Sequence, residues 1–156
     1  MIQHVRSLEL RIPPVALLII FAAVMAVLAY AVPASVSVPE RLTVAVVLVV
    51  AGALVALAGV VAFRRHKTTV NPFTPEQSSS LVATGIYRFS RNPMYLGFML
   101  ALVGWCAYLA NWVSALLLPV FVAYLNRFQI QPEERALKER FGQQFLAYSQ
   151  SVRRWL

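Results

Sequence analysis

Gly85–Gly97 reads GIYRFSRNPMYLG and interrupts a chain that is otherwise strongly apolar. The stretch holds two arginines, an Asn-Pro pair and two tyrosines, and apolar segments lie on both sides of it. A simple membrane anchor would need only a short polar turn between two such segments. We therefore expect this stretch to bind a ligand.

The composition predicts an integral membrane protein of one domain. Hydrophobic residues make up 60% of the 156 residues, whereas soluble domains contain about 45–50%. The mean hydropathy is +0.68. The chain carries 14 lysines and arginines against 6 acidic residues. In so apolar a chain these cations belong at lipid headgroups, so membrane lipids are the expected partners and nucleic acid is not.

No metal site is expected from the metal-binding residue types. Cys106 is the sole cysteine and stands among apolar residues, so the chain can form neither an internal disulfide nor a thiolate cluster. His4 and His66 are far apart and lack the spacing of metal ligands.

Four apolar segments are expected to form transmembrane helices, at about residues 15–32, 42–63, 95–110 and 112–125. The first two are uncharged over about 18 and about 22 residues, which suffices to cross the hydrocarbon core of a bilayer. The last two form a helical hairpin with Asn111 at its tip, and each is short for a full crossing. The expected fold class is therefore all-α integral membrane.

One alternative concerns the first apolar segment. Arg6 and Arg11 precede it, as cations precede the apolar region of a cleaved signal peptide. The apolar region is too long for such a peptide, and Glu9 is atypical of one. We therefore prefer a transmembrane helix.

Small residues fall on one face of the second segment: Ala45, Gly52, Ala56 and Gly59. Such a face lets two membrane helices approach closely where lipid supplies no hydrophobic driving force. We expect it to pack against another helix.

A polar loop at 64–94 and an amphipathic helix at 132–148 complete the expected fold. Pro132 suits the first position of that helix. Its apolar stripe consists of Leu137, Phe141, Phe145 and Tyr148. The sequence Arg153-Arg154-Trp155 that follows is typical of an interfacial anchor.

The distribution of cations predicts the orientation. If the loop at 33–41 and the Asn111 tip lie on one side, that side carries only Arg41 of the 14 basic residues. The positive-inside rule then places both termini, the 64–94 loop and the amphipathic helix in the cytoplasm. We expect a bacterial inner (plasma) membrane protein.

Two polar blocks then share the cytoplasmic side, and the hairpin returns the chain from one to the other. Their motif residues are Leu81-Val82 and Gly85-x-Tyr87-Arg88-x-x-Arg91-Asn92-Pro93-x-Tyr95-x-Gly97, then Glu133-Glu134-x-x-Leu137-x-x-x-Phe141-Gly142-x-x-Phe145-x-x-Tyr148. In these residues the chain resembles the isoprenylcysteine carboxyl methyltransferase family, including its wider bacterial membrane members and the related phospholipid methyltransferases. The resemblance runs from about Leu81 to the C-terminus.

The resemblance implies an S-adenosylmethionine-dependent methyl transfer to a lipid-like or small amphiphilic acceptor, either to a carboxylate oxygen or to an amine. The cofactor-binding residues that it implies are Leu81, Val82, Gly85, Tyr87, Asn92, Pro93, Met94, Tyr95 and Glu133. Glu133 can accept from the amino group or the ribose of the cofactor. A tyrosine ring facing the sulfonium would gain about 0.5–2 kcal/mol.

The arginines and Gln129 are the residues that indicate which kind of methyl acceptor the protein could bind. Arg91 and Arg127 are the candidate catalytic cations, and Arg127 and Gln129 the candidate substrate-binding residues. The prenylcysteine enzymes have an arginine four residues before the cofactor glutamate, where this chain has Gln129. They also have a histidine where this chain has Asn92, which cannot titrate near neutral pH. Both departures weaken the case for a prenylcysteine substrate, though not for the cofactor.

The same residues also have structural interpretations. Carboxylates in the first turn of a helix, such as Glu133 and Glu134, are favourable by about 0.3–1 kcal/mol. Arginines and tyrosines at a membrane surface can serve only as anchors. Asn92-Pro93 can simply start a helix.

Two other functions remain open. The chain could be a non-catalytic membrane protein that keeps the scaffold for lipid binding or helix association. A membrane reductase of related architecture is the third possibility, but the sequence has no Gly-rich dinucleotide fingerprint.

Overall fold

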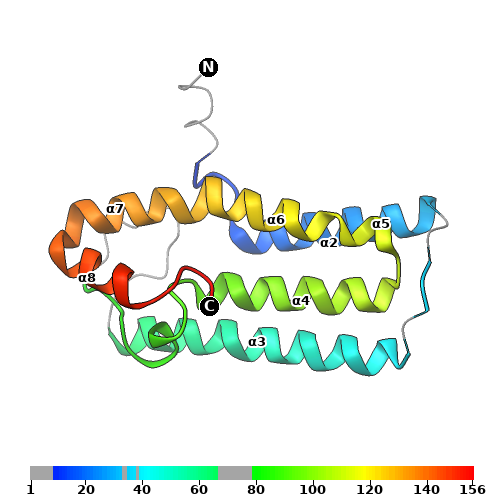
Figure 1. Ribbon diagram of the computed structural model, residues 1–156, viewed down its shortest axis with the longest axis horizontal. Coiled ribbons are helices and arrows are strands. Elements are labelled where there is room, and N and C mark those ends of the chain that lie inside the picture. Colours follow the sequence, from blue (N-terminus) through cyan, green and yellow to red (C-terminus); the bar gives the residue numbers. More distant parts are fainter. Residues whose placement is uncertain (1–8, 33–34, 38, 67–78) are drawn as a thin grey trace, which may run out of the picture.

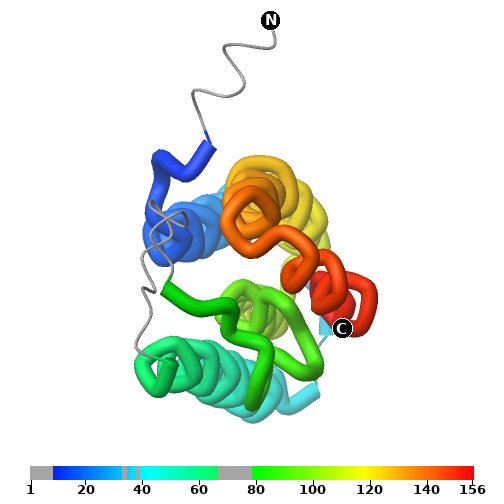
Figure 2. Tube along the Cα trace, turned by 90° about the vertical axis from the view of Figure 1, so that its left-hand side faces the viewer, coloured from blue at the N-terminus to red at the C-terminus, as the bar shows by residue number. Residues whose placement is uncertain are grey.

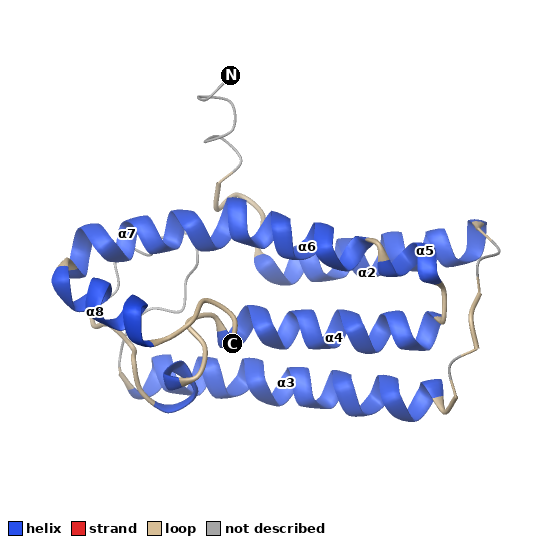
Figure 3. Ribbon diagram, viewed as in Figure 1, coloured by secondary structure: helices blue, strands red, loops and turns tan. Residues whose placement is uncertain are grey.

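The computed structural model describes residues 9–32, 35–37, 39–66 and 79–156. No strand occurs among these residues, and the expected all-helical fold is confirmed (Figure 3). The elements are α2 (Pro14–Ala31), α3 (Arg41–Arg65), η2 (Gly85–Arg88), α4 (Pro93–Leu109), α5 (Trp112–Ala115), α6 (Leu117–Leu125), η3 (Asn126–Ile130), α7 (Gln131–Phe141) and α8 (Gln143–Ser151). The long helices lie side by side with alternating directions (Figures 1 and 2).

Among the described residues, three helices are long and apolar enough to cross a membrane: Pro14–Ala31, Arg41–Arg65 and Trp112–Phe141. The third joins α5, α6, η3 and α7 into one helical run. Helix α4 is apolar as well but shorter, with 17 residues. All three spans and α4 cover the apolar segments that the sequence predicts.

Helices α3 and α4 pack closely through small residues, as the sequence predicts. Ala45, Gly52 and Gly59 are buried on α3, and a Cβ atom placed on Gly104 of α4 would lie 2.8 Å from the carbonyl oxygen of Ala45. A Cβ on Gly52 would run into the backbone of Gly97. The two backbones can therefore meet only because these positions lack side chains.

The chain reverses at Asn111, where the sequence predicts the tip of a hairpin. Ala110 ends α4 in the left-handed conformation, with φ 48°. The Asn111 side chain then caps α5: its Oδ1 accepts from the Ser114 N–H at 3.0 Å, and its Nδ2 donates to the Val32 carbonyl at 3.0 Å. This turn therefore also fixes the end of α2.

The C-terminal helices differ from the single helix expected over 132–148. The helix does not begin at Pro132, because it runs on from α6 through the π-helical turn η3 into α7. Pro132 has no N–H for the carbonyl of Phe128, which instead accepts from the N–H of Leu10 at 3.0 Å. Gly142, with φ 50°, then separates α7 from α8.

Two apolar cores result from this arrangement. One lies within the bundle and contains Leu17, Met25, Leu102, Phe121 and Leu125. The other lies at the end that carries α7 and α8, where Phe145 and Tyr148 pack with Val82 and Tyr87. Figure 1 shows the C-terminus at this end, beside the start of α4. The second core thus joins the two blocks that the sequence predicts to meet.

Candidate functional site

The two polar blocks meet through Tyr95 and Glu133. Tyr95 lies in the first turn of α4 and is buried, with 6% of its surface exposed. Its hydroxyl donates a hydrogen bond to Oε1 of Glu133, in the first turn of α7. The hairpin therefore brings together the two motif residues that lie 38 positions apart.

The turn before α4 explains why Tyr95 faces inward. Asn92 precedes the helix with a non-helical backbone (φ −130°, ψ 54°), and Pro93 occupies its first turn, where a missing N–H costs nothing. The Asn92 N–H donates to the Ser90 hydroxyl at 3.1 Å. Its side-chain Nδ2 donates to the backbone carbonyl of Arg154 at 2.9 Å. Asn92 is thus bound to the C-terminal tail, while Met94 beside it packs toward Gly59 of α3.

Tyr87 belongs to the short helix η2, and its side chain is buried. Gly85 begins η2 with φ 62°, a conformation that favours glycine. The Tyr87 ring packs edge-on against Phe63, with 5.3 Å between ring centroids. Its backbone carbonyl accepts from the Tyr148 hydroxyl at 2.7 Å. Val82 is buried in the same core, and Leu81 packs against it.

The two tyrosines of this core are uncharged at neutral pH. Burial raises the pKa of Tyr87 well above its usual value, and the nearby Tyr148 and Glu133 add to the rise. Burial raises the pKa of Tyr148 to about 12, against a smaller lowering by the Arg91 charge. Both phenols therefore keep their protons, so Tyr148 can donate to the carbonyl of Tyr87.

Arg91 lies in an ionic cluster with Glu134 and Arg154. Its Nη2 is 3.0 Å from Oε1 of Glu134, and its Nη1 donates to the Ser149 carbonyl at 3.1 Å. Arg154 donates to both oxygens of Glu134, at 3.1 and 2.6 Å. The hydrogen bond to Glu134 raises the pKa of Arg154. Arg91, a candidate catalytic cation, is thus bound by protein groups.

Arg127 and Gln129 belong to η3 and contact the chain segment that precedes α2. Arg127 is 2.7 Å from the Glu9 carboxylate, which also pairs with Arg135. Gln129 is buried, and its Nε2 donates to the Ile12 carbonyl at 2.8 Å. Its Oε1 has no hydrogen-bond partner among the residues described. Within the described part of the chain, Arg127 therefore forms its ion pair with Glu9 and not with Glu133.

Three contacts near the site are not evident from the sequence. Glu9 pairs with Arg127, the Ser149 carbonyl accepts from Arg91, and Glu134 pairs with Arg154. Glu9 was visible as a lone carboxylate in a basic stretch, yet nothing in the sequence indicates that it reaches Arg127, 118 positions away. Arg154 was expected to be a membrane anchor. Its side chain also pairs with Glu134.

S-adenosylmethionine is the cofactor that the motif resemblance implies, and the residues present suit it. A partly buried carboxyl group (Glu133), aromatic rings (Tyr87 and Tyr95) and an apolar wall (Leu81 and Val82) converge at one end of the bundle. Part of the expected 64–94 loop, residues 67–78, lies outside the described residues. No group of three or more metal-ligating side chains was found within the described part of the chain.

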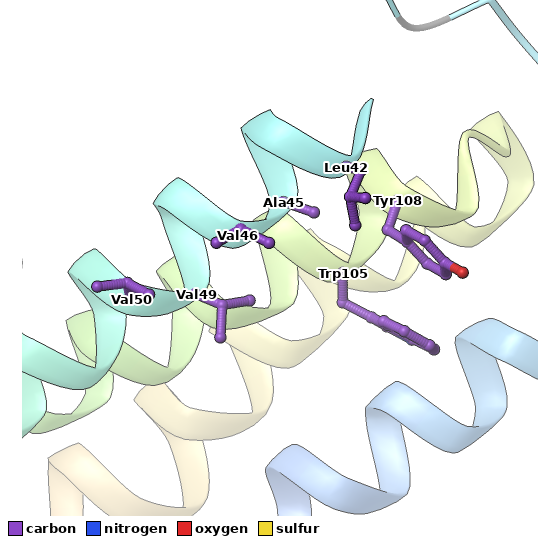
Figure 4. Close-up of a pocket in the computed structure, with 7 residues that line it drawn as sticks. All are labelled: Leu42, Ala45, Val46, Val49, Val50, Trp105 and Tyr108. Carbon is purple, nitrogen blue, oxygen red and sulfur yellow. The ribbon is translucent and has the colours of Figure 1, made fainter. Parts of the chain in front are cut away.

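A groove on the side of the bundle has the wrong chemistry for this cofactor. Its volume is about 360 Å³, and it lies between α3 and α4 (Figure 4). Its lining residues are Leu42, Ala45, Val46, Val49, Val50, Trp105 and Tyr108. None of these residues is charged, so the groove offers no charged partner for the carboxylate or the amino group of the cofactor. The groove also lies along the apolar part of α3, away from Tyr95 and Glu133.

Fold and site define a class: a small all-helical integral membrane protein with a polar site at one end of its bundle. The sequence profile described as "Phospholipid methyltransferase" matches residues 40–144. The chain therefore belongs to the phospholipid methyltransferase family, which confirms the resemblance read from its motifs.

Individual relatives agree with this membership. The chain is 36% identical over 95 residues to protein-S-isoprenylcysteine O-methyltransferase A of Arabidopsis thaliana, covering 61% of this chain and 48% of the plant protein. It is 36% identical over 80 residues to the yeast (Saccharomyces cerevisiae) protein-S-isoprenylcysteine O-methyltransferase, covering 49% and 32%. An uncharacterized Haemophilus influenzae protein is 41% identical over 63 residues, which are 40% of this chain and all of that protein.

The chain thus spans half or less of the named methyltransferases it matches. No solved structure matches it significantly.

Proposed function

We propose that the chain is an S-adenosylmethionine-dependent methyltransferase that acts at the membrane–cytoplasm interface on a lipid-like or small amphiphilic acceptor. The hydrogen bond between Tyr95 and Glu133 is the observation that carries the proposal. It joins the two halves of the motif in one place. Family membership supports the same reaction class.

Each residue at this end has a role suited to the cofactor. The Glu133 carboxylate accepts from the amino group or the ribose hydroxyls, and Tyr95 fixes the orientation of that carboxylate through its hydroxyl. The rings of Tyr87 and Tyr95 offer faces to a sulfonium or to adenine. Val82, Leu81, Gly85, Pro93 and Met94 complete the wall around them.

The cofactor would supply an activated methyl group, and the protein chiefly has to align the acceptor with it. Alignment of two reactants can contribute about 7–11 kcal/mol to catalysis. A carboxylate acceptor is already nucleophilic and needs a nearby cation, whereas an amine must lose its proton. The residues around the acceptor therefore decide between the two.

Arg127 and Gln129 favour different acceptors. Arg127 could hold a carboxylate, as an isoprenylcysteine acceptor would present, once it is released from Glu9. Gln129 instead offers a buried, unpartnered carbonyl oxygen, which can accept a hydrogen bond from an amine or a hydroxyl. We retain both O-methylation and N-methylation, with Gln129 as the reason to include the second.

The membrane arrangement belongs to the same proposal. Four helical segments enter the bilayer, both termini face the cytoplasm, and the protein resides in a bacterial inner membrane. The clustering of Arg64, Arg65, Arg88 and Arg91 at the Tyr95–Glu133 end supports this orientation.

Cofactor binding and methyl transfer test the proposal separately. S-adenosylhomocysteine should bind the purified chain in detergent, as measured by calorimetry. Labelled methyl groups should then pass from S-adenosylmethionine to a farnesylcysteine analogue or to phosphatidylethanolamine in nanodiscs. Absence of binding, with Tyr95→Phe and Glu133→Ala both silent in cells, would leave the non-catalytic scaffold as the better hypothesis.

A further inference from the structure

Two adjacent carboxylates on α7 face different partners. Glu133 accepts from Tyr95 of α4. Glu134 accepts from Arg154 at 3.1 and 2.6 Å and lies 3.0 Å from Arg91. The pair of glutamates in the motif therefore divides into one that faces the site and one that faces the C-terminal tail.

The tail, residues 152–156, is bound by two further hydrogen bonds to the residues that precede α4 and by one to η3. The Arg91 N–H donates to the Arg153 carbonyl at 3.0 Å. Asn92 Nδ2 donates to the Arg154 carbonyl at 2.9 Å. Trp155 Nε1 donates to Oδ1 of Asn126 in η3 at 3.1 Å. The tail thus runs from α8 past the residues that precede α4 to η3.

The ionic cluster is more than a set of exposed surface charges. The side chains of Arg91 and Glu134 are 14% and 20% exposed, and that of Arg154 is 35% exposed. Water and salt screen such partly buried pairs less than exposed ones. Arg154 holds Glu134 through both of its oxygens, a geometry that fixes orientation as well as distance.

We propose that Glu134 and Arg154 are positioning residues that make the C-terminal tail a wall of the cofactor site. Glu134 anchors the first turn of α7 to the tail and to Arg91, and this anchoring holds the neighbouring Glu133 against Tyr95. Arg154 supplies the tail side of the anchor. The inference rests on the proposed function, because it assigns these residues to the same cofactor site.

Affinity for S-adenosylhomocysteine, measured by calorimetry on the full chain in detergent, tests this role. Arg154→Ala and Glu134→Gln should each weaken binding by about 10-fold or more, the loss expected for a charge-assisted hydrogen bond. Arg154→Lys keeps the charge but not the two-pronged geometry, so it should recover part of the affinity. In turnover assays the KM for S-adenosylmethionine should rise, whereas the KM for the acceptor should not.

Two neighbouring residues provide matched controls. Arg153→Ala removes an equal charge whose side chain is exposed, and Glu139→Gln removes an exposed carboxylate of α7. Both should bind S-adenosylhomocysteine as the wild type does. Thermal unfolding identifies any variant that fails to fold, and Arg154→Lys or Glu134→Gln then replaces Arg154→Ala.

The outcomes separate this inference from the proposed function. If the wild type binds and folded Arg154→Ala and Glu134→Gln bind equally well, the positioning role is wrong while the proposed function stands. If the wild type does not bind, the proposed function itself fails. An equal loss in Arg153→Ala would show a general charge effect and would overturn the positioning role as well.

Discussion

The hydroxyl of Tyr95 donates a hydrogen bond to the carboxylate of Glu133, linking the first turn of α4 to the first turn of α7. We predict that Tyr95→Phe weakens S-adenosylhomocysteine binding by about 10-fold, because the hydrogen bond that orients the carboxyl group of Glu133 is lost while the ring remains. Calorimetry on the detergent-purified protein measures the change.

A second substitution makes this prediction specific. Glu133→Gln keeps the size of the side chain and can still accept from Tyr95, but an amide NH₂ group, which cannot accept from the cofactor amino group, replaces one carboxyl oxygen. It should bind at least as weakly as Tyr95→Phe. Affinity at the wild-type level in both variants would exclude this pair from the cofactor site.

Tyr148 should contribute to stability through the carbonyl of Tyr87. Tyr148→Phe removes the 2.7 Å hydrogen bond and leaves that carbonyl without its hydroxyl partner. The expected loss is about 1–3 kcal/mol in the free energy of unfolding. Thermal unfolding in detergent, compared with Phe141→Leu as an apolar control in the same core, measures it.

The burial of the same phenol predicts a pH dependence of the stability. Folding raises the pKa of Tyr148 from 10.0 to about 12, so the folded state favours the protonated phenol. The stabilisation should be fully present below pH 10 and should be lost as the pH rises toward 12. The stability difference between wild type and Tyr148→Phe should therefore stay constant from about pH 6 to 9 and shrink above pH 10. A difference that changes below pH 9 would contradict the assignment to this phenol.

Much of the fold could be predicted because it depends on local patterns. The uncharged apolar runs predict both ends of α2, α3 and α4 to within two residues, and Asn111 marks the turn after α4. The C-terminal half could not be predicted as well. Pro132 indicates a helix start from local rules, but the N–H of Leu10 satisfies the freed carbonyl of Phe128 and lets the helix continue. No local pattern reports a partner so distant in sequence.

The candidate site, like the fold, could be predicted only in part from the sequence. The meeting of Tyr95 and Glu133 followed from hairpin geometry and from the motif, both readable in the sequence. The partners of Glu134, Arg91 and Asn92 depend on the path of the tail, which only the folded chain defines. The sequence therefore predicts the residues of the proposed cofactor site better than it predicts the contacts that hold those residues in place.

The packing of α3 on α4 should tolerate no side chain at Gly52. A Cβ there would meet the Gly97 carbonyl oxygen and lie 3.0 Å from the Ala101 nitrogen. Gly52→Leu should cost about 1–3 kcal/mol or more through overpacking. Ala53→Leu, at an exposed position of the same helix, is the matched control and should be neutral. Equal unfolding temperatures for the two variants in detergent would contradict the observed close approach.

Glu9 should control how available Arg127 is. Arg127 and Arg135 are 38% and 50% exposed, so their pairs with Glu9 should add less than about 1 kcal/mol to stability. Glu9→Gln should therefore leave the unfolding temperature nearly unchanged while releasing the Arg127 guanidinium. If Arg127 holds a carboxylate acceptor, Glu9→Gln should lower the KM for a farnesylcysteine analogue several-fold, and Arg127→Gln should raise it. An amine acceptor held by Gln129 would respond to neither change, so the pair of variants, assayed with both acceptor types, distinguishes O-methylation from N-methylation.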